Sequence, residues 1–123
     1  MKHKKHIILL FLVFITTSLF SVTPSASPNK SNCEIYIASA FSPNGDGQNE
    51  VFKPMFYCTL HEYKFAVYDR FRGLLFYTTN QDEGWDGYNK TEKMGIGVYE
   101  YLVFYKVNPN DEQQHKYGSV TLL

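Results

Sequence analysis

The feature that most restricts the fold of this chain is the way in which turn-forming residues divide it, after residue 27, into short segments. None of these segments keeps its apolar residues at the helical period of about 3.6 residues. The apolar residues instead alternate, most clearly over residues 63–68 and 97–107, which places successive side chains on opposite faces of a strand. Short segments separated by Gly, Pro, Asn and Asp predict an all-β fold, a β-sandwich of about six or seven strands.

The expected strands and turns follow from this pattern. Strands are predicted over residues 34–40, 51–55, 63–68, 74–78, 97–107 and 116–122, and turns over residues 42–50, 69–73, 80–87 and 108–114. Residues 51–55 are expected at a sheet edge, because Pro54 has no N–H to donate to a neighbouring strand. Residues 97–107 are mostly apolar on both faces, which predicts a central strand. Gly73 is expected to supply the unusual backbone angle of the hairpin turn that precedes residues 74–78.

Residues 1–27 have the composition of a secretory signal peptide. They hold a basic start, an apolar run over residues 7–15, and then smaller, more polar residues. This order is typical of a signal for Sec export to the periplasm, cleaved near Ser25 or Ser27, and an uncleaved anchor is the alternative. The apolar run is shorter than the roughly 20 residues that a span needs, so no transmembrane span is expected after cleavage. Residues 28–34 form a short polar lead-in.

Removal of the signal peptide makes the chain mildly acidic. The full sequence has 12 Lys and Arg against 12 Asp and Glu, and three lysines but no acid lie in the signal peptide. The net charge after cleavage is therefore about −3. Nucleic-acid binding, which needs a clustered basic surface, is not expected.

Both cysteines, Cys33 and Cys58, follow the predicted signal peptide. In an oxidising compartment, two cysteines in a small domain favour a disulfide over a metal site. The bridge would close a loop of roughly 25 residues and stabilise the fold by about 3 kcal/mol in the chain-entropy model. Two buried free thiols are the alternative.

Residues 42–50 combine a proline, two glycines and several Asn and Asp residues, which excludes the interior of a strand. Oxygen-bearing side chains recur at every second position, a spacing that permits a calcium loop. These residues are Asn44, Asp46, Gln48 and Glu50. The EF-hand pattern fails, because Asn49 and Met55 stand where it requires Gly and Glu. The alternative, which the composition favours, is a structural turn whose side chains accept hydrogen bonds from backbone N–H groups.

Two aromatic features permit ligand binding but also fit a packing role. Trp85 can stack on a sugar or a partner protein, or it can close one end of the sandwich with its N–H on a loop carbonyl and Asp86 capping a turn. The tyrosines of residues 97–107 form a row that resembles a stacking platform. The same row fits a sandwich core with a half-covered outer face, and we expect packing roles for both features.

The sequence has no recognisable catalytic group. His61 and His115 are the two histidines after the signal peptide, and both are expected in exposed turns. The sequence contains neither a nucleophile elbow nor a reactive-cysteine context. Asp82, Glu83 and Asp86 cluster in a polar loop, without the cleft that a pair of carboxylates needs for glycoside chemistry. Neither enzymatic activity nor a small-molecule substrate is expected.

Several separate stretches resemble, in order, the gliding-motility-associated C-terminal domain, the type B sorting domain of the Bacteroidetes type IX secretion system. The matching stretches are AFSPNGDGQNEVFKP at residues 40–54, YDRFRGLLF at 68–76, GWDG at 84–87, GIGVYEY at 95–101 and KYGSVTLL at 116–123. The chain departs from the family pattern in Glu50 for Asp, Asp69 for Asn and Phe71 for Trp. The glycine of the hairpin also comes one place late, and the proline expected at position 95 is a glycine.

The resemblance covers residues 35–123 and implies an immunoglobulin-like β-sandwich with a role in sorting. Such a domain engages the outer-membrane type IX machinery and is carried to the cell surface or the medium, without catalysis. The residues that the resemblance marks for recognition are Phe41, Pro43, Asn44, Gly45, Asp46, Gly47, Asn49, Arg70, Gly118, Ser119, Val120, Thr121 and Leu122. Apart from calcium in the loop of residues 42–50, no cofactor is expected.

Two other interpretations remain at this point. The sequence holds little cargo besides the domain, so the chain is also compatible with a stand-alone binding module, adhesin-like and stabilised by calcium. A remnant of a longer gene is the third interpretation.

Overall fold

A computed structural model describes residues 21 and 32–123, and residues 32–123 belong to one compact unit. The predicted signal peptide and most of the lead-in lie outside the described residues. Within the described part, no helix is long and apolar enough to cross a membrane.

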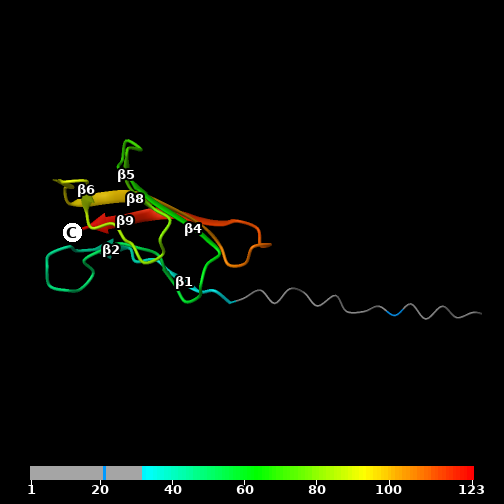
Figure 1. Cartoon of the computed structure of the whole chain (residues 1–123). Coiled ribbons are helices and arrows are strands. Elements are labelled where there is room, and N and C mark those ends of the chain that lie inside the picture. The colour runs from blue at the N-terminus through cyan, green and yellow to red at the C-terminus, as the bar shows by residue number, and fades with distance from the viewer. Residues whose placement is uncertain (1–20, 22–31) are drawn as a thin grey trace, which may run out of the picture. The chain divides into compact units, whose positions relative to one another are not determined.

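The main element is a five-stranded sheet with the strand order β2-β9-β8-β4-β5 (Figure 1). Its strands are β2 (Ala40–Phe41), β9 (Gln114–Leu122), β8 (Gly97–Lys106), β4 (Glu62–Tyr68) and β5 (Leu74–Thr78). Neighbouring strands are antiparallel, except that β2 runs parallel to β9. The longest strand, β8, lies at the centre of this sheet, as its two apolar faces predict.

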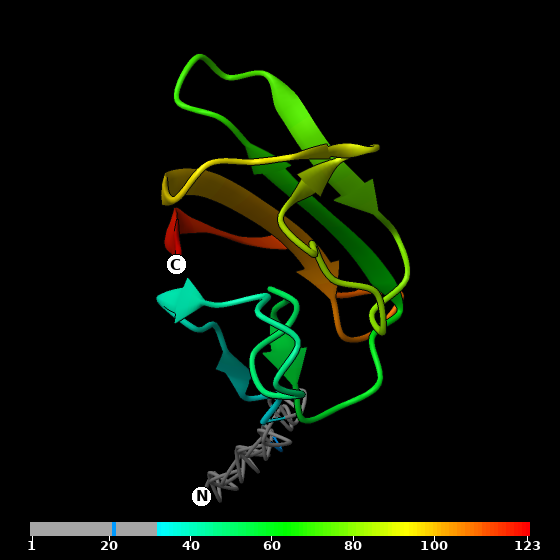
Figure 2. The same cartoon turned by 90° about the vertical axis from the view of Figure 1, so that its left-hand side faces the viewer.

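Two small sheets complete the fold. In one, β1 (Ile35–Tyr36) pairs with β3 (Met55–Phe56), and in the other β6 (Tyr88–Asn89) pairs with β7 (Glu92–Lys93). Figure 2 shows these short segments across one face of the curved large sheet. Because Ile35 and Phe56 pack against the buried side chains, the sheet of β1 and β3 covers part of the core. The predicted all-β sandwich is confirmed.

The core consists mainly of aromatic side chains from the inner face of the large sheet and from the segments that cover it. Its buried members are Phe41, Phe52, Tyr63, Phe65, Val67, Trp85, Tyr99, Val103, Val120 and Leu122. The rings meet edge-on or tilted, for example Phe52 on Phe65 with centroids 5.6 Å apart and Trp85 on Tyr99 with centroids 4.8 Å apart. Such contacts add to the stabilisation that burial provides.

Short strands account for most differences from the prediction. The predicted strand of residues 34–40 is split into β1 and β2, and the predicted edge strand of residues 51–55 is a single bridge at Phe52 followed by β3. The β6–β7 hairpin was not predicted. Strand β9 begins at Gln114, so His115 lies in a strand and the prediction of a turn there was wrong. Strands β1, β2 and β3 are only two residues long, and they form because of pairing with distant segments rather than because of local alternation.

The hairpin turn of residues 69–73 uses its glycine differently from the prediction. Arg72, not Gly73, adopts the left-handed conformation, with φ 65°. Gly73 is needed because a Cβ there would lie 2.6 Å from Oδ2 of Asp69. The Asp69 carboxylate caps the turn, with Oδ1 accepting hydrogen bonds from the N–H groups of Phe71 and Gly73 at 2.8 Å each. The glycine therefore makes room for a cap.

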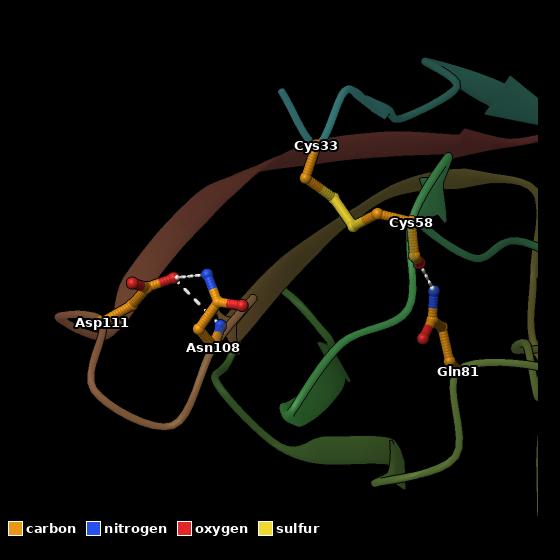
Figure 3. Close-up of a disulfide and its surroundings, with 5 residues drawn as sticks. All are labelled: Cys33, Cys58, Gln81, Asn108 and Asp111. Carbon is orange, nitrogen blue, oxygen red and sulfur yellow. Dashed lines mark hydrogen bonds between the residues drawn. A yellow bond between two sulfur atoms is a disulfide. The ribbon is translucent and has the colours of Figure 1, made fainter. Parts of the chain in front are cut away.

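A disulfide joins Cys33 to Cys58, with their Cα atoms 5.4 Å apart. It connects the chain just before β1 to the chain just after β3 (Figure 3). The Cys58 carbonyl accepts a hydrogen bond of 3.1 Å from the side chain of Gln81, which connects the loop after β5 to the disulfide. The turn between β8 and β9 is closed separately, by hydrogen bonds of 2.9 Å from Asn108 to the Asp111 carboxylate.

Candidate functional site

The strand pairings bring several distant segments to one end of the large sheet. Because Tyr68 pairs with Glu100 and Gly97 pairs with Leu122, the end of β4, the start of β8 and the end of β9 lie together. The parallel pair of β2 and β9 adds the segment that follows β2. We call this region the loop end, and it consists of residues 42–50, 69–74, 94–98 and 122–123. Figure 1 shows the C-terminus and the loop after β2 on one side, opposite the β8–β9 turn.

Strands β2 and β9, the first and last strands of the large sheet in chain order, are hydrogen-bonded to each other at the loop end. Ala40 pairs with Thr121 and Phe41 with Leu122, while the Thr121 N–H donates to the Ser39 carbonyl at 2.9 Å. The side chains of Phe41 and Leu122 are both buried in the core. The stretch of residues 40–54 and the stretch of residues 116–123, which match the family at opposite ends of the domain, therefore form one structural unit.

The loop of residues 42–50 is closed by its own polar side chains. Oδ1 of Asn44 accepts a hydrogen bond from the Asp46 N–H at 3.0 Å, and Oδ1 of Asp46 accepts one from the Gln48 N–H at 2.8 Å. The two carboxylate oxygens of Glu50 accept hydrogen bonds from Gly45 and Gly47, at 3.0 and 2.9 Å. Side-chain oxygens thus accept four backbone N–H groups of the loop, while the Ser42 N–H donates to the Asn49 carbonyl at 3.0 Å and closes the loop.

Three residues of this loop have positive φ angles. They are Gly45 at 81°, Gly47 at 83° and Asn49 at 54°. Glycine and asparagine adopt this conformation at the least steric cost. The Asp46 carboxylate has a pKa below its usual value, mainly because the Gln48 N–H donates to its charged form.

The oxygens of the four residues expected to bind calcium are mostly engaged in these bonds. One side-chain oxygen of Asn44, one of Asp46 and both of Glu50 each accept a backbone N–H, and Gln48 contributes its own N–H. Among the described residues, no group of three or more His, Cys, Asp or Glu side chains is arranged to hold a metal ion. The geometry is that of a hydrogen-bonded turn.

Arg70 and Phe71 lie in the turn of residues 69–73, between β4 and β5. The guanidinium carbon of Arg70 lies 5.0 Å from the centroid of the Phe71 ring, and Arg70 forms no ion pair with a described carboxylate. The Phe71 side chain is 80 % exposed. A hollow of about 360 Å³ separates this turn from residues 94–99. Ile96, on its opposite wall, is 82 % exposed.

These exposed apolar side chains were not among the predicted recognition residues. Besides Phe71 and Ile96, the loop end exposes Val98, Leu74 and Leu123. The sequence contains a signal for two of them, because Phe71 interrupts a charged turn and Ile96 stands between two glycines. Large apolar residues at such positions have no core to enter, and grouped exposed apolar residues mark interaction surfaces.

The predicted recognition residues divide into a buried group and an exposed group. Phe41, Val120 and Leu122 are buried, and Gly118 lies against the ring of Tyr101, whose hydroxyl would be 2.7 Å from an added Cβ. Pro43 and Thr121 are half-buried. The exposed residues are Asn44, Gly45, Asp46, Gly47, Asn49, Arg70 and Ser119. The buried group shapes the loop end, and the exposed group is accessible to a partner.

Trp85 is fully buried, so it is not available to stack on a ligand. Its backbone exchanges two hydrogen bonds with Phe52, and its indole N–H donates to the Tyr88 carbonyl at 2.9 Å. The Tyr88 N–H in turn donates to Asp86 at 3.0 Å. Gly87, with φ 85°, lets the backbone approach Pro43 and Leu122. The packing interpretation of Trp85 and the capping role of Asp86 are both confirmed.

The remaining candidates for chemistry have structural partners or lie far apart. Glu83 accepts a hydrogen bond of 2.5 Å from the Thr78 hydroxyl, and Lys53 donates to the Asp82 carbonyl at 3.0 Å. His61 precedes β4, while the ring of His115 lies over Phe104 with centroids 5.9 Å apart. In the tyrosine row, Tyr99 is buried and Tyr101 and Tyr105 pack against the core. These groups do not converge on one pocket.

The described residues define the class of this protein as a small, disulfide-bonded β-sandwich domain, with most of its motif residues at one end of the large sheet. The family model of the CHU_C type IX secretion signal domain matches residues 35–122, and the chain belongs to this family. It therefore carries a signal for export by the type IX secretion system to the cell surface. No curated protein matches the chain.

Proposed function

We propose that the loop end is the surface through which the type IX machinery recognises this domain, after Sec export has brought the chain to the periplasm. Recognition, not catalysis, is its role. The observation that supports this proposal is that three segments distant in sequence, residues 40–54, 69–73 and 116–123, all reach the same end of the large sheet. The family pattern includes all three.

The chemistry of the loop end supports a protein as the partner. Its exposed apolar residues Phe71, Ile96 and Val98 line the same hollow as Arg70, which forms no ion pair with a described carboxylate. An aromatic and apolar patch with an arginine is the composition that protein interfaces favour. The loop of residues 42–50, closed by its own hydrogen bonds, adds an exposed polar surface at the same end of the sheet. Because these bonds already hold the loop in one conformation, less entropy is lost when it binds.

A charge reversal at the loop end tests this proposal. Arg70→Glu should reduce the amount of protein at the cell surface and leave it in the periplasm. Lys64→Glu is the matched control, because Lys64 is also exposed but pairs with Phe104, near the opposite end of the sheet. Both variants carry an internal epitope tag in the β8–β9 turn and are compared by fractionation of the native host. Equal surface amounts for the two variants would contradict the role of the loop end.

The same fractionation in a strain without the type IX translocon tests the route. We expect wild-type protein to move from the surface to the periplasm in that strain. A shorter chain lacking residues 118–123 should also remain in the periplasm, but it loses Val120 and Leu122 from the core. Because that deletion also weakens the fold, the Arg70→Glu variant is the more specific test of recognition.

A further inference from the structure

Strand β9 is paired on one side only for most of its length. It pairs with β8 from Gln114 to Leu122, whereas β2 pairs only with Thr121 and Leu122. Among the described residues, no strand lies along the other side of residues 114–120. Such an open edge presents unpaired N–H and C=O groups to any extended chain.

The hydrogen bonds at the end of β9 show which residues point outward. Thr121 and Leu123 donate their N–H groups to Ser39 and Phe41, on the side away from β8. Because the direction of these groups alternates along a strand, odd-numbered residues of β9 point away from β8. His115, Tyr117 and Ser119 therefore offer three N–H donors and three C=O acceptors at the open edge. No described backbone group bonds them.

A hollow of about 460 Å³ lies beside this edge, on the outer face of the sheet. Tyr117, which is 79 % exposed, and Tyr68 line it together with Leu102. Arg72 and Glu100 add charge to its rim. A strand added to the edge would direct every second side chain toward this face. Main-chain bonds at an edge with a neighbouring side-chain hollow are the two elements of strand addition.

We propose that the open edge of β9 binds an extended segment of the type IX machinery as an additional strand, with an apolar side chain in the hollow beside Tyr117. This inference rests on the proposed function, because it concerns how the machinery holds the domain. The added strand forms main-chain hydrogen bonds with His115, Tyr117 and Ser119.

Lys116 argues against a second copy of this chain as the added strand. In a twofold pairing centred on Lys116, the two ammonium groups would face each other directly across the strands. In one centred on Tyr117, the two lysines would be diagonal neighbours, with Cα atoms roughly 7–8 Å apart, which is within reach of long side chains. Like charges at such positions are destabilising, and edge lysines are a known device against self-association.

Proline substitution tests the edge, because proline removes the N–H group and is tolerated at sheet edges. Tyr117→Pro should lower the surface amount by about tenfold, the effect of losing one or two hydrogen bonds of about 1 kcal/mol each. Tyr77→Pro is the matched control. The alternation of N–H directions, followed from β9 across β8 and β4 to β5, places the Tyr77 N–H on the outer edge of β5, away from β4. Tyr117→Thr keeps the N–H and should be exported better than Tyr117→Pro.

Circular dichroism and melting of the purified domains establish whether each variant folds. If Tyr117→Pro does not fold, His115→Pro, near the start of β9, replaces it. Normal translocon-dependent export of the folded proline variant would overturn the inference, as would equal losses in Tyr117→Pro and Tyr117→Thr. Wild-type export without the translocon would instead overturn the proposed function. A purified dimer that Tyr117→Pro abolishes, measured by sedimentation, would assign the edge to a second copy and overturn the choice of partner.

Discussion

The hydroxyl of Tyr63 is a polar group in an apolar environment. The side chain is buried between Phe56 and Phe65, and the hydroxyl has no hydrogen-bond partner among the described residues. Burial raises the pKa of this phenol well above its usual value. A buried polar group without a partner costs free energy that a phenylalanine would not.

We expect Tyr63→Phe to raise the free energy of unfolding by about 1 kcal/mol, measured by urea denaturation at neutral pH. The pH dependence should change as well. Because the folded-state pKa is raised, the wild type loses stability as the pH rises above about 10, where the unfolded phenol ionises. The variant should lack this part of the alkaline loss. A variant less stable than the wild type would show that the hydroxyl is satisfied.

Asp46 gives a prediction at the acid end of the pH range. Its pKa is lowered, chiefly by the Gln48 N–H, so its contribution to stability is present above its usual value of 3.8 and is lost as the pH falls below it. Asp46→Asn keeps an acceptor for the Gln48 N–H but does not titrate. Thermal unfolding of the variant should therefore depend less on pH below about pH 4 than that of the wild type. Identical acid profiles would contradict this assignment.

Calcium binding to the loop of residues 42–50 has a cost that the sequence does not reveal. A metal ion would compete with Gly45 and Gly47 for the carboxylate of Glu50. We therefore expect millimolar calcium to leave the melting temperature unchanged. A rise in melting temperature that Asp46→Ala abolishes would contradict this expectation and establish the loop as a calcium site.

At the scale of elements, β8 and β9 fit together through a glycine. A Cβ at Gly118 would lie 2.7 Å from the hydroxyl oxygen of Tyr101 and 3.0 Å from its ring. We expect Gly118→Ala to destabilise the fold by about 1–3 kcal/mol, because the ring is confined by Phe52 on its other side. Adding Tyr101→Phe should recover part of this loss, since it removes the nearest atom.

Gly95→Ala is the control for the Gly118→Ala variant, because nothing lies within 4 Å of an added Cβ at Gly95. Its unfolding free energy should stay within about 0.5 kcal/mol of the wild type. If the losses of unfolding free energy were additive in the double variant Gly118→Ala/Tyr101→Phe, Gly118 and Tyr101 would not be in contact. Export assays on these variants separate a structural role of Gly118 from direct recognition.

The elements that the sequence predicts well are those whose pattern is local. The alternation of residues 63–68 and 97–107 predicts β4 and β8 to within one residue, and residues 74–78 match β5. The two-residue strand β2 carries no such pattern, because its existence depends on β9. The turn of residues 69–73 was located correctly, but the residue with the positive φ angle was not, because the Asp69 cap determines it.

The candidate site shows the same division. The sequence marks the stretches of residues 40–54 and 116–123, but their contact is a property of the folded sheet. Phe71 and Ile96 were missed because exposure of an apolar residue is decided by what else reaches the core. The open edge of β9 was missed because it depends on the shortness of β2.

At the scale of the whole molecule, the disulfide is the main covalent constraint on a small core. It closes a loop with a sequence separation of 25 residues. The double variant Cys33→Ser/Cys58→Ser should lose about 3 kcal/mol of unfolding free energy, measured by urea denaturation. Reduced and alkylated wild-type protein should show a similar loss. Unchanged stability in both samples would mean that the core alone holds β1 and β3.

The pairing of β2 with β9 also determines the order in which the domain can form. Ala40 bonds to a partner 81 positions later, at Thr121, so the ring of the adjacent Phe41 has no complete pocket until almost all of the chain is available. Pairings between such distant residues close slowly, because the long intervening loop loses entropy first. The domain therefore cannot be completed until β9 has left the ribosome or the translocation pore, because the core lacks Val120 and Leu122 before then. The last strand thus sets the moment at which the domain can close.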